Sequence, residues 1–184
     1  MDLFIINNGI LYPSPHALMI KPFKIIWEND NSEGNEESLR WFRYIELLCS
    51  PKKSNPYYGY TDKDLRAEKV KEEVFGDAKY EINMDLMMAT IAYEELLQNS
   101  SPSYDNLVAA EIAAFKLGKF LKELEPSAKT PSGALVLKPK DIAAAIAELP
   151  KINKTLSEAR DKVNEELKED AKTRNNREIG FFER

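Results

Sequence analysis

The sequence predicts a mainly α-helical fold: a helical bundle with an extended N-terminal arm, a possible short β-hairpin, and a long C-terminal helix with a docking tail. Three observations lead to this prediction. Apolar residues recur at the 3.6-residue period of an α-helix in several segments after residue 35. Prolines interrupt the β-forming residues before residue 28. Two adjacent phenylalanines follow a long charged stretch at the end of the chain.

Composition limits the classes of protein. The chain has 184 residues, of which 43% are hydrophobic and 31% charged. That is enough for one domain with its own core, which we divide into an arm (1–35), a helical core domain (36–149) and a C-terminal helix with a tail (150–184). The net charge of −5 excludes a protein that coats nucleic acid with basic surface. The single cysteine excludes an intrachain disulfide and fits a reducing compartment. We expect no secretory signal and no membrane span.

The first 27 residues are expected to be extended. An apolar run, Leu3 to Ile6, precedes the turn signal Asn7-Asn8-Gly9, and a second short apolar run follows. The β-forming residues 17–27 contain Pro22, which lacks a backbone donor and therefore favours an arm or an edge strand. Residues 28–37 are acidic and predict a solvated loop.

The next two helices have clear limits. Residues 36–49 carry apolar side chains at helical spacing, and Ser50-Pro51 ends the segment. An aromatic loop, 51–61, follows. Thr61 or Asp62 then caps a charged surface helix that runs to about Phe75.

The core is expected from two further helices, about 80–98 and 103–124. Both carry apolar residues on two sides, which indicates a central position in a bundle or a surface shared with a neighbouring subunit. Residues 126–139 predict a loop with a short strand at 134–137. A helix at 140–149 should be stopped or kinked by Pro150, and the last helix should run to about Arg174.

Catalytic, cofactor and metal sites are not expected. His16 is the only histidine and Cys49 has no CxxC partner, so neither a zinc site nor a Cys-His dyad has a supporting motif. Glu94-Glu95 and Glu111 on the two apolar helices lack the Glu-x-x-His pairs of a di-metal bundle. No glycine-rich phosphate-binding motif is present in the sequence.

Three segments are candidates for partner binding. An apolar group after a polar spacer is typical of a tail that docks on another subunit, and the aromatic loop mixes lysines with tyrosines. That loop could contact nucleic acid through Lys52 and Lys53, but we favour packing on its own fold or on a neighbour, because no broader basic surface surrounds it. The predicted partner-binding residues are Ile179, Phe181 and Phe182 in the tail, Tyr57, Tyr58 and Tyr60 in the loop, and Leu3 and Phe4 in the arm.

Residues 17–27 and 44–56, within a region of about 17–75, resemble small structural proteins of tailed bacteriophages, with the crAss-like phages as the nearest group. Proteins of this kind are head-to-tail connectors, or ring adaptors. The resemblance implies a mainly helical subunit of a dodecameric ring that contacts the portal protein and other tail or ring proteins. It also implies a place in the neck or tail of a virion assembled in the host cytoplasm, around passing genomic DNA. No functional residues can be transferred from the resemblance.

Two other functions remain open from the sequence. The first is a nucleic-acid-associated packaging or regulatory protein that uses Lys52, Lys53 and the loop tyrosines. The second is a small enzyme built around His16 and Cys49.

Overall fold

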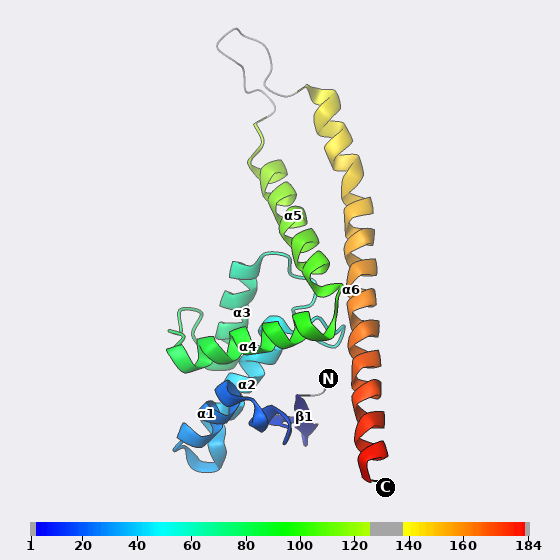
Figure 1. The fold of residues 1–184 in the computed structure, drawn as a ribbon. Coiled ribbons are helices and arrows are strands. Elements are labelled where there is room, and N and C mark those ends of the chain that lie inside the picture. Colours follow the sequence, from blue (N-terminus) through cyan, green and yellow to red (C-terminus); the bar gives the residue numbers. More distant parts are fainter. Residues whose placement is uncertain (1–2, 126–137, 183–184) are drawn as a thin grey trace.

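The computed structural model describes the backbone of residues 3–125 and 138–182, with side chains up to residue 170. It confirms the predicted class: the chain is 71% helical, with six helices and a two-stranded antiparallel hairpin in the described ranges. The hairpin and α1–α4 form a body, from which α5 and the first part of α6 extend as a two-helix projection (Figure 1). The remainder of α6 runs back along the body.

The hairpin comprises β1 (Phe4–Asn7) and β2 (Ile10–Pro13), with Asn7 paired to Ile10. Asn8 and Gly9 join the strands with φ angles of 51° and 80°, the two left-handed conformations of a type I′ turn. The predicted turn is therefore confirmed. Leu3 and Phe4 point into the body, whereas Ile5 and Ile6 are exposed.

The prediction of an extended arm over residues 17–27 is wrong. These residues form a 3-10 helix, Ala17–Met19, and most of α1 (Lys21–Asn29). Pro22 lies in the first turn of α1, where its missing N–H has no intrahelical partner to lose. Phe23 and Ile26 then lie one turn apart on the buried face. The same proline that argued against a central strand thus favours the start of a helix.

The core of the body is aromatic. Phe4 from the hairpin lies between α1 and α2, with its ring centroid 5.9 Å from Phe23 and 5.5 Å from Phe42. The ring of Tyr93 from α4 stacks on Phe4 at 5.7 Å, and its hydroxyl donates to Glu46 at 2.5 Å. Each such ring pair stabilises the fold by about 0.5–1.5 kcal/mol beyond the area it buries. The N-terminal segment is therefore part of the core.

Two predicted helices have the expected limits. α2 is Glu36–Cys49, and α3 is Lys63–Phe75. The Asp62 carboxylate accepts hydrogen bonds from the N–H groups of Asp64 and Leu65, which makes it the N-cap of α3. Gly76 ends α3 in a left-handed conformation, with φ of 74°.

The prediction that two helices form the core is correct for the first helix but not for the second. α4 (Met84–Ser100), capped by Asn83, buries Leu86, Ala89, Tyr93 and Leu97 in the body. α5 (Tyr104–Glu123) buries only Tyr104 and Leu107. The rest of α5 leaves the body and lies along α6 in the projection (Figure 1). Some of its apolar residues face one neighbouring helix, and others, such as Ile112 and Phe120, are exposed.

α6 is one helix, Pro139–Phe182, of 44 residues, so of the two predicted effects of Pro150, a stop or a kink, the stop does not occur. Pro150 is exposed, and the apolar seam continues on both sides of it through Leu149, Ile152 and Leu156. Packing of this seam compensates for the backbone hydrogen bond that a proline removes. The backbone stays helical to Phe182, beyond the predicted end at Arg174. The predicted loop and strand at 126–137 lie outside the described residues.

Candidate interaction surface

α6 is attached to the body at the connection between α4 and α5. The Glu166 carboxylate accepts hydrogen bonds from Ser101 Oγ at 2.6 Å, Ser103 Oγ at 2.6 Å and Ser103 N at 3.0 Å. Partial burial acts to raise the pKa of Glu166, but these hydrogen bonds outweigh it and hold that pKa below its ordinary value. Glu166 therefore stays ionised, and it joins α6 to both helices of the body–projection junction.

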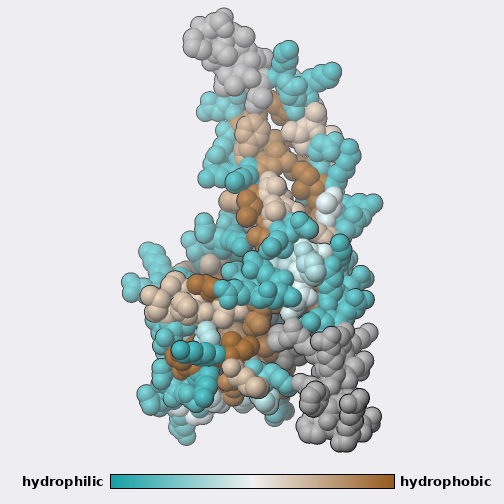
Figure 2. Space-filling view, viewed as in Figure 1, coloured by the Kyte–Doolittle hydropathy of each residue, from teal (hydrophilic) through white to brown (hydrophobic). Residues whose placement is uncertain are grey.

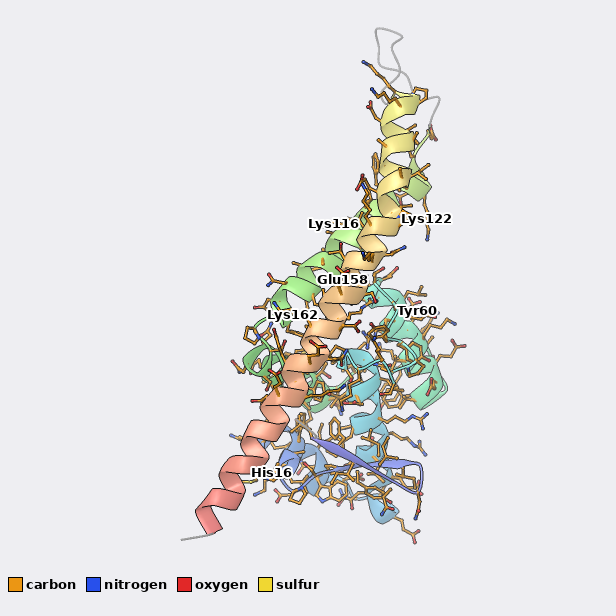
Figure 3. All side chains as sticks on the ribbon, turned by 90° about the vertical axis from the view of Figure 1, so that its right-hand side faces the viewer. His16, Tyr60, Lys116, Lys122, Glu158 and Lys162 are labelled. Atoms are coloured by element: carbon orange, nitrogen blue, oxygen red, sulfur yellow. The ribbon has the colours of Figure 1, made fainter. Side chains whose placement is uncertain are left out.

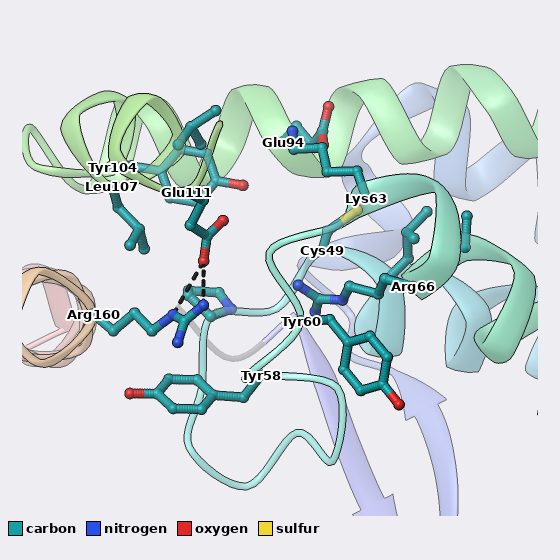
Figure 4. Close-up of a pocket in the computed structure, with 14 residues that line it drawn as sticks. Cys49, Tyr58, Tyr60, Lys63, Arg66, Glu94, Tyr104, Leu107, Glu111 and Arg160 are labelled. Atoms are coloured by element: carbon teal, nitrogen blue, oxygen red, sulfur yellow. Dashed lines mark hydrogen bonds and ion pairs between the residues drawn. The ribbon is translucent and has the colours of Figure 1, made fainter. Parts of the chain in front are cut away.

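A second contact joins α6 to α5 at the base of the projection. The Arg160 guanidinium donates through Nη2 and Nε to Glu111 Oε1, at 2.8 and 3.1 Å (Figure 4). Both side chains are largely buried, at 9% and 13% exposure. The guanidinium also lies over the Tyr58 ring, 4.7 Å from its centroid. The aromatic loop is thereby joined to both helices.

A pocket of about 180 Å³ lies beneath this loop (Figure 4). Arg66 on its wall is committed to structure, because its guanidinium donates to the carbonyl oxygens of Leu47 and Ser50 at the end of α2. Cys49 also lines the pocket, and burial raises the pKa of its thiol well above the ordinary value. The thiol is therefore protonated and is a weak nucleophile. His16 lies toward the other end of the molecule from the projection (Figure 3).

The aromatic loop is held by its own chain. The Asn55 side chain donates to the carbonyl oxygens of Leu47 and Ser50, each at 2.9 Å. Tyr57 donates its hydroxyl to Glu73 at 2.7 Å, and burial together with Glu73 raises the pKa of Tyr57 to about 12. The ring of Tyr60 lies 5.6 Å from that of Tyr57. All three predicted partner-binding tyrosines thus have contacts within the chain: Tyr57 with Glu73 and Tyr60, and Tyr58 with Arg160.

The two lysines of the loop have acidic neighbours. Lys53 lies 2.7 Å from an oxygen of Asp161, and Lys52 lies 3.4 Å from an oxygen of Glu46. These carboxylates offset the positive charge that a phosphate contact would use. The alternative of a nucleic-acid contact at this loop stays a prediction.

The other predicted partner-binding residues have different outcomes. Leu3 and Phe4 are 5% and 9% exposed in the core, so they are not available to a partner in this conformation. They pack inward because Phe4 completes the aromatic cluster. The side chains of Ile179, Phe181 and Phe182 lie outside the described residues, and only their helical backbone is described. The backbone of the predicted docking tail is helical up to Phe182, and its docking stays a prediction.

Besides Ile5, Ile6 and Ile10 of the hairpin, exposed apolar residues occur on α4 and α5, which the sequence reasoning placed in the core, and on α6 beside α5. The first area, the methionine face of α4, comprises Met84, Met87, Met88 and Ile91, each between 41% and 65% exposed. The second is on the projection, where Ile112, Phe120 and Ile146 are 41–54% exposed. Brown and tan side chains gather along the projection in Figure 2. The sequence indicated that α4 and α5 are apolar on two sides, but it did not identify which of their apolar residues would be exposed.

Two findings concern other classes of site. Within residues 3–125 and 138–170, no group of three or more His, Cys, Asp or Glu side chains could hold a metal ion. No helix among the described residues is long and apolar enough to cross a membrane.

No protein-family model, curated protein or solved structure matches the chain. The fold and its surfaces therefore provide the basis for a functional proposal.

Proposed function

We propose that this chain is a structural, non-enzymatic subunit of a bacteriophage virion: a ring adaptor that joins the portal to the tail and lines the DNA passage. The observation that carries the proposal is the pair of exposed apolar areas on α4 and on the projection. Exposed apolar residues that gather on one face of a helix, as on α4, are typical of a contact with another chain. Two separate areas suit a ring, in which each subunit uses different surfaces toward its two neighbours.

The shape of the molecule supports the same proposal. The projection carries α5 and α6 away from the body, where they can reach an adjacent subunit (Figure 1). The net charge of −5 suits a channel wall that lets DNA pass without holding it. The resemblance of residues 17–75 to connector proteins is the reason for proposing a portal-to-tail ring in particular.

The test is the mass of the purified full-length chain by light scattering, alone and with the portal protein of the same phage. A discrete high-order oligomer, alone or on the portal, is the expected result. A monomer at all concentrations that ignores the portal would overturn the proposal. DNA binding that weakens steeply with salt would then favour a nucleic-acid-associated protein.

A further inference from the structure

We propose that one helical stripe on the projection docks on the methionine face of α4 in a second copy of this chain. The inference rests on the proposed function as an assembly subunit, and it names the two surfaces that meet. The stripe, called here the outer stripe of α5, comprises Ile112, Lys116, Lys119 and Phe120. All four side chains are exposed.

Each of the two surfaces is continuous along its helix. On α4 the spacing is i, i+3, i+4 and i+7 for Met84, Met87, Met88 and Ile91, and Glu95 follows at i+11. On α5, Ile112, Lys116 and Phe120 are four residues apart. Residues at these spacings lie on one side of a helix. Both stripes extend over about two turns, so they match in length.

The two surfaces also match in chemistry. Unbranched methionine side chains adapt to irregular shapes, and aromatic rings make favourable contacts with methionine sulfur. Phe120 and Ile112 therefore have suitable receptors on α4. Within one copy, the outer stripe of α5 and the methionine face of α4 lie on different helices, and both are exposed to solvent. A second copy can cover both without any change in the body.

Charge identifies a second copy as the occupant. The segments that form the projection, 112–125 and 138–155, contain seven lysines and four acidic residues. The segment around the methionine face, 77–98, contains five acidic residues and one lysine. Lys116 and Lys122 lie on the projection, well separated from the opposite end of the molecule (Figure 3). The basic stripe of one copy is thus complementary to the acidic surroundings of the other, which favours this orientation.

The contact is heterologous, because different surfaces meet. Such a contact repeats from copy to copy and yields a closed ring or an open chain. A contact of about two helical turns on each side is smaller than the interface of about 1,600 Å² in a typical stable complex. A single contact is therefore weak, and closure of a ring, in which every copy makes two, favours assembly.

Cysteine cross-linking tests the contact directly. The native Cys49 is buried, so cysteines introduced at Met88 and Phe120 are the reactive ones. A mixture of Met88→Cys and Phe120→Cys chains with a short bismaleimide should yield a band at twice the chain mass. A mixture of Ile10→Cys and Phe120→Cys is the matched control, because Ile10 and Met88 are both 47% exposed. Cross-linking of Met88→Cys chains to one another would indicate a symmetric dimer and overturn the proposal, as would no cross-link at all.

A charge-swap experiment provides an independent measurement. The variant K116E/K119E should raise the concentration needed for half-assembly at least about tenfold, because like charges then meet. The variant D85K/E95K should do the same. A mixture of the two variants should assemble as the wild type does, because each contact then joins opposite charges. Unchanged assembly of either variant, or no recovery in the mixture, would overturn the proposed contact.

The two proposals can fail separately. Assembly on the portal without a link between positions 88 and 120 would leave the connector proposal standing and remove this contact. A link between these positions in a protein that ignores the portal would support the contact and remove the connector role.

Discussion

The body and the projection are both built from amphipathic helices, yet their interiors differ. In the body, α1, α2, α4 and the hairpin surround side chains such as Phe23 and Phe42, which are completely buried. In the projection, two helices face each other alone, and residues such as Leu117, Leu121 and Leu149 are only half-buried. A pair of helices has too little shared surface to enclose a core. The difference shows that the body encloses a core, whereas the projection leaves much of its apolar surface exposed.

The largest difference in stability between the two regions is expected when one phenylalanine is removed from each. Phe42→Ala in the body should lower the free energy of unfolding by about 3–5 kcal/mol, because it leaves a cavity among packed rings. Phe120→Ala in the projection should change it by no more than about 0.5 kcal/mol, because the ring is 48% exposed. Urea unfolding of both variants checks this. Equal losses would show that the projection is stabilised in the same way as the body.

The junction between the regions should be nearly as sensitive. Arg160→Met leaves the largely buried Glu111 carboxylate without its partner, which should lower the free energy of unfolding by about 3 kcal/mol. The double variant Arg160→Met, Glu111→Leu should recover most of that loss, because no unpaired charge remains. Thermal unfolding of the single and double variants measures the difference. A single variant as stable as the wild type would show that the ion pair does not hold the junction.

A smaller effect is expected at the attachment of α6. Glu166→Gln should lower the free energy of unfolding by about 1–2 kcal/mol at neutral pH, since charged hydrogen bonds become neutral ones. The folded-state pKa of Glu166 lies below its ordinary value of 4.5. Its contribution is therefore complete above that value and is lost as the pH falls below it, through the folded-state pKa. Wild type and variant should converge in acid, and a constant difference over the range of pH would contradict the assigned hydrogen bonds.

The smallest global effect is expected at Pro150. Pro150→Ala restores a backbone donor inside α6 and should stabilise the projection locally, by up to about 3 kcal/mol. The free energy of unfolding of the body should stay unchanged, because this residue is exposed and distant from the aromatic core. Hydrogen exchange of α6 amides should slow near position 150 alone. Slower exchange throughout the body would show that the two regions unfold together.

Local signals in the sequence predicted much of the fold. The limits of α2, a cap of α3 at Thr61 or Asp62 and the turn at Asn8-Gly9 all depend on neighbouring residues, and all three were predicted; the structure places the cap at Asp62. The errors arose where one residue supports two interpretations. Pro22 is compatible with an edge strand and with the first turn of a helix. The burial of Phe23 against the rings of Phe4 and Phe42, from the hairpin and α2, decided between them.

The candidate surface was less accessible to sequence reasoning. The two-sided apolar character of α4 and α5 was visible, but which side remains exposed depends on the elements that cover each helix. Glu166 meets Ser101 and Ser103 across more than 60 residues, a distance at which no local pattern applies. The tyrosines of the loop looked available because Arg160 and Glu73, which hold two of them, lie far along the chain.

The continuity of α6 has a mechanical consequence. At a rise of 1.5 Å per residue, its 44 residues form a rod about 66 Å long. The rod is attached near its middle, through Arg160 and Glu166, and carries one arm into the projection and the other along the body. Because the helix is continuous and is fixed near the α4–α5 connection, its two halves move as one rigid rod. A contact that tilts the half in the projection therefore displaces the half along the body in the opposite direction.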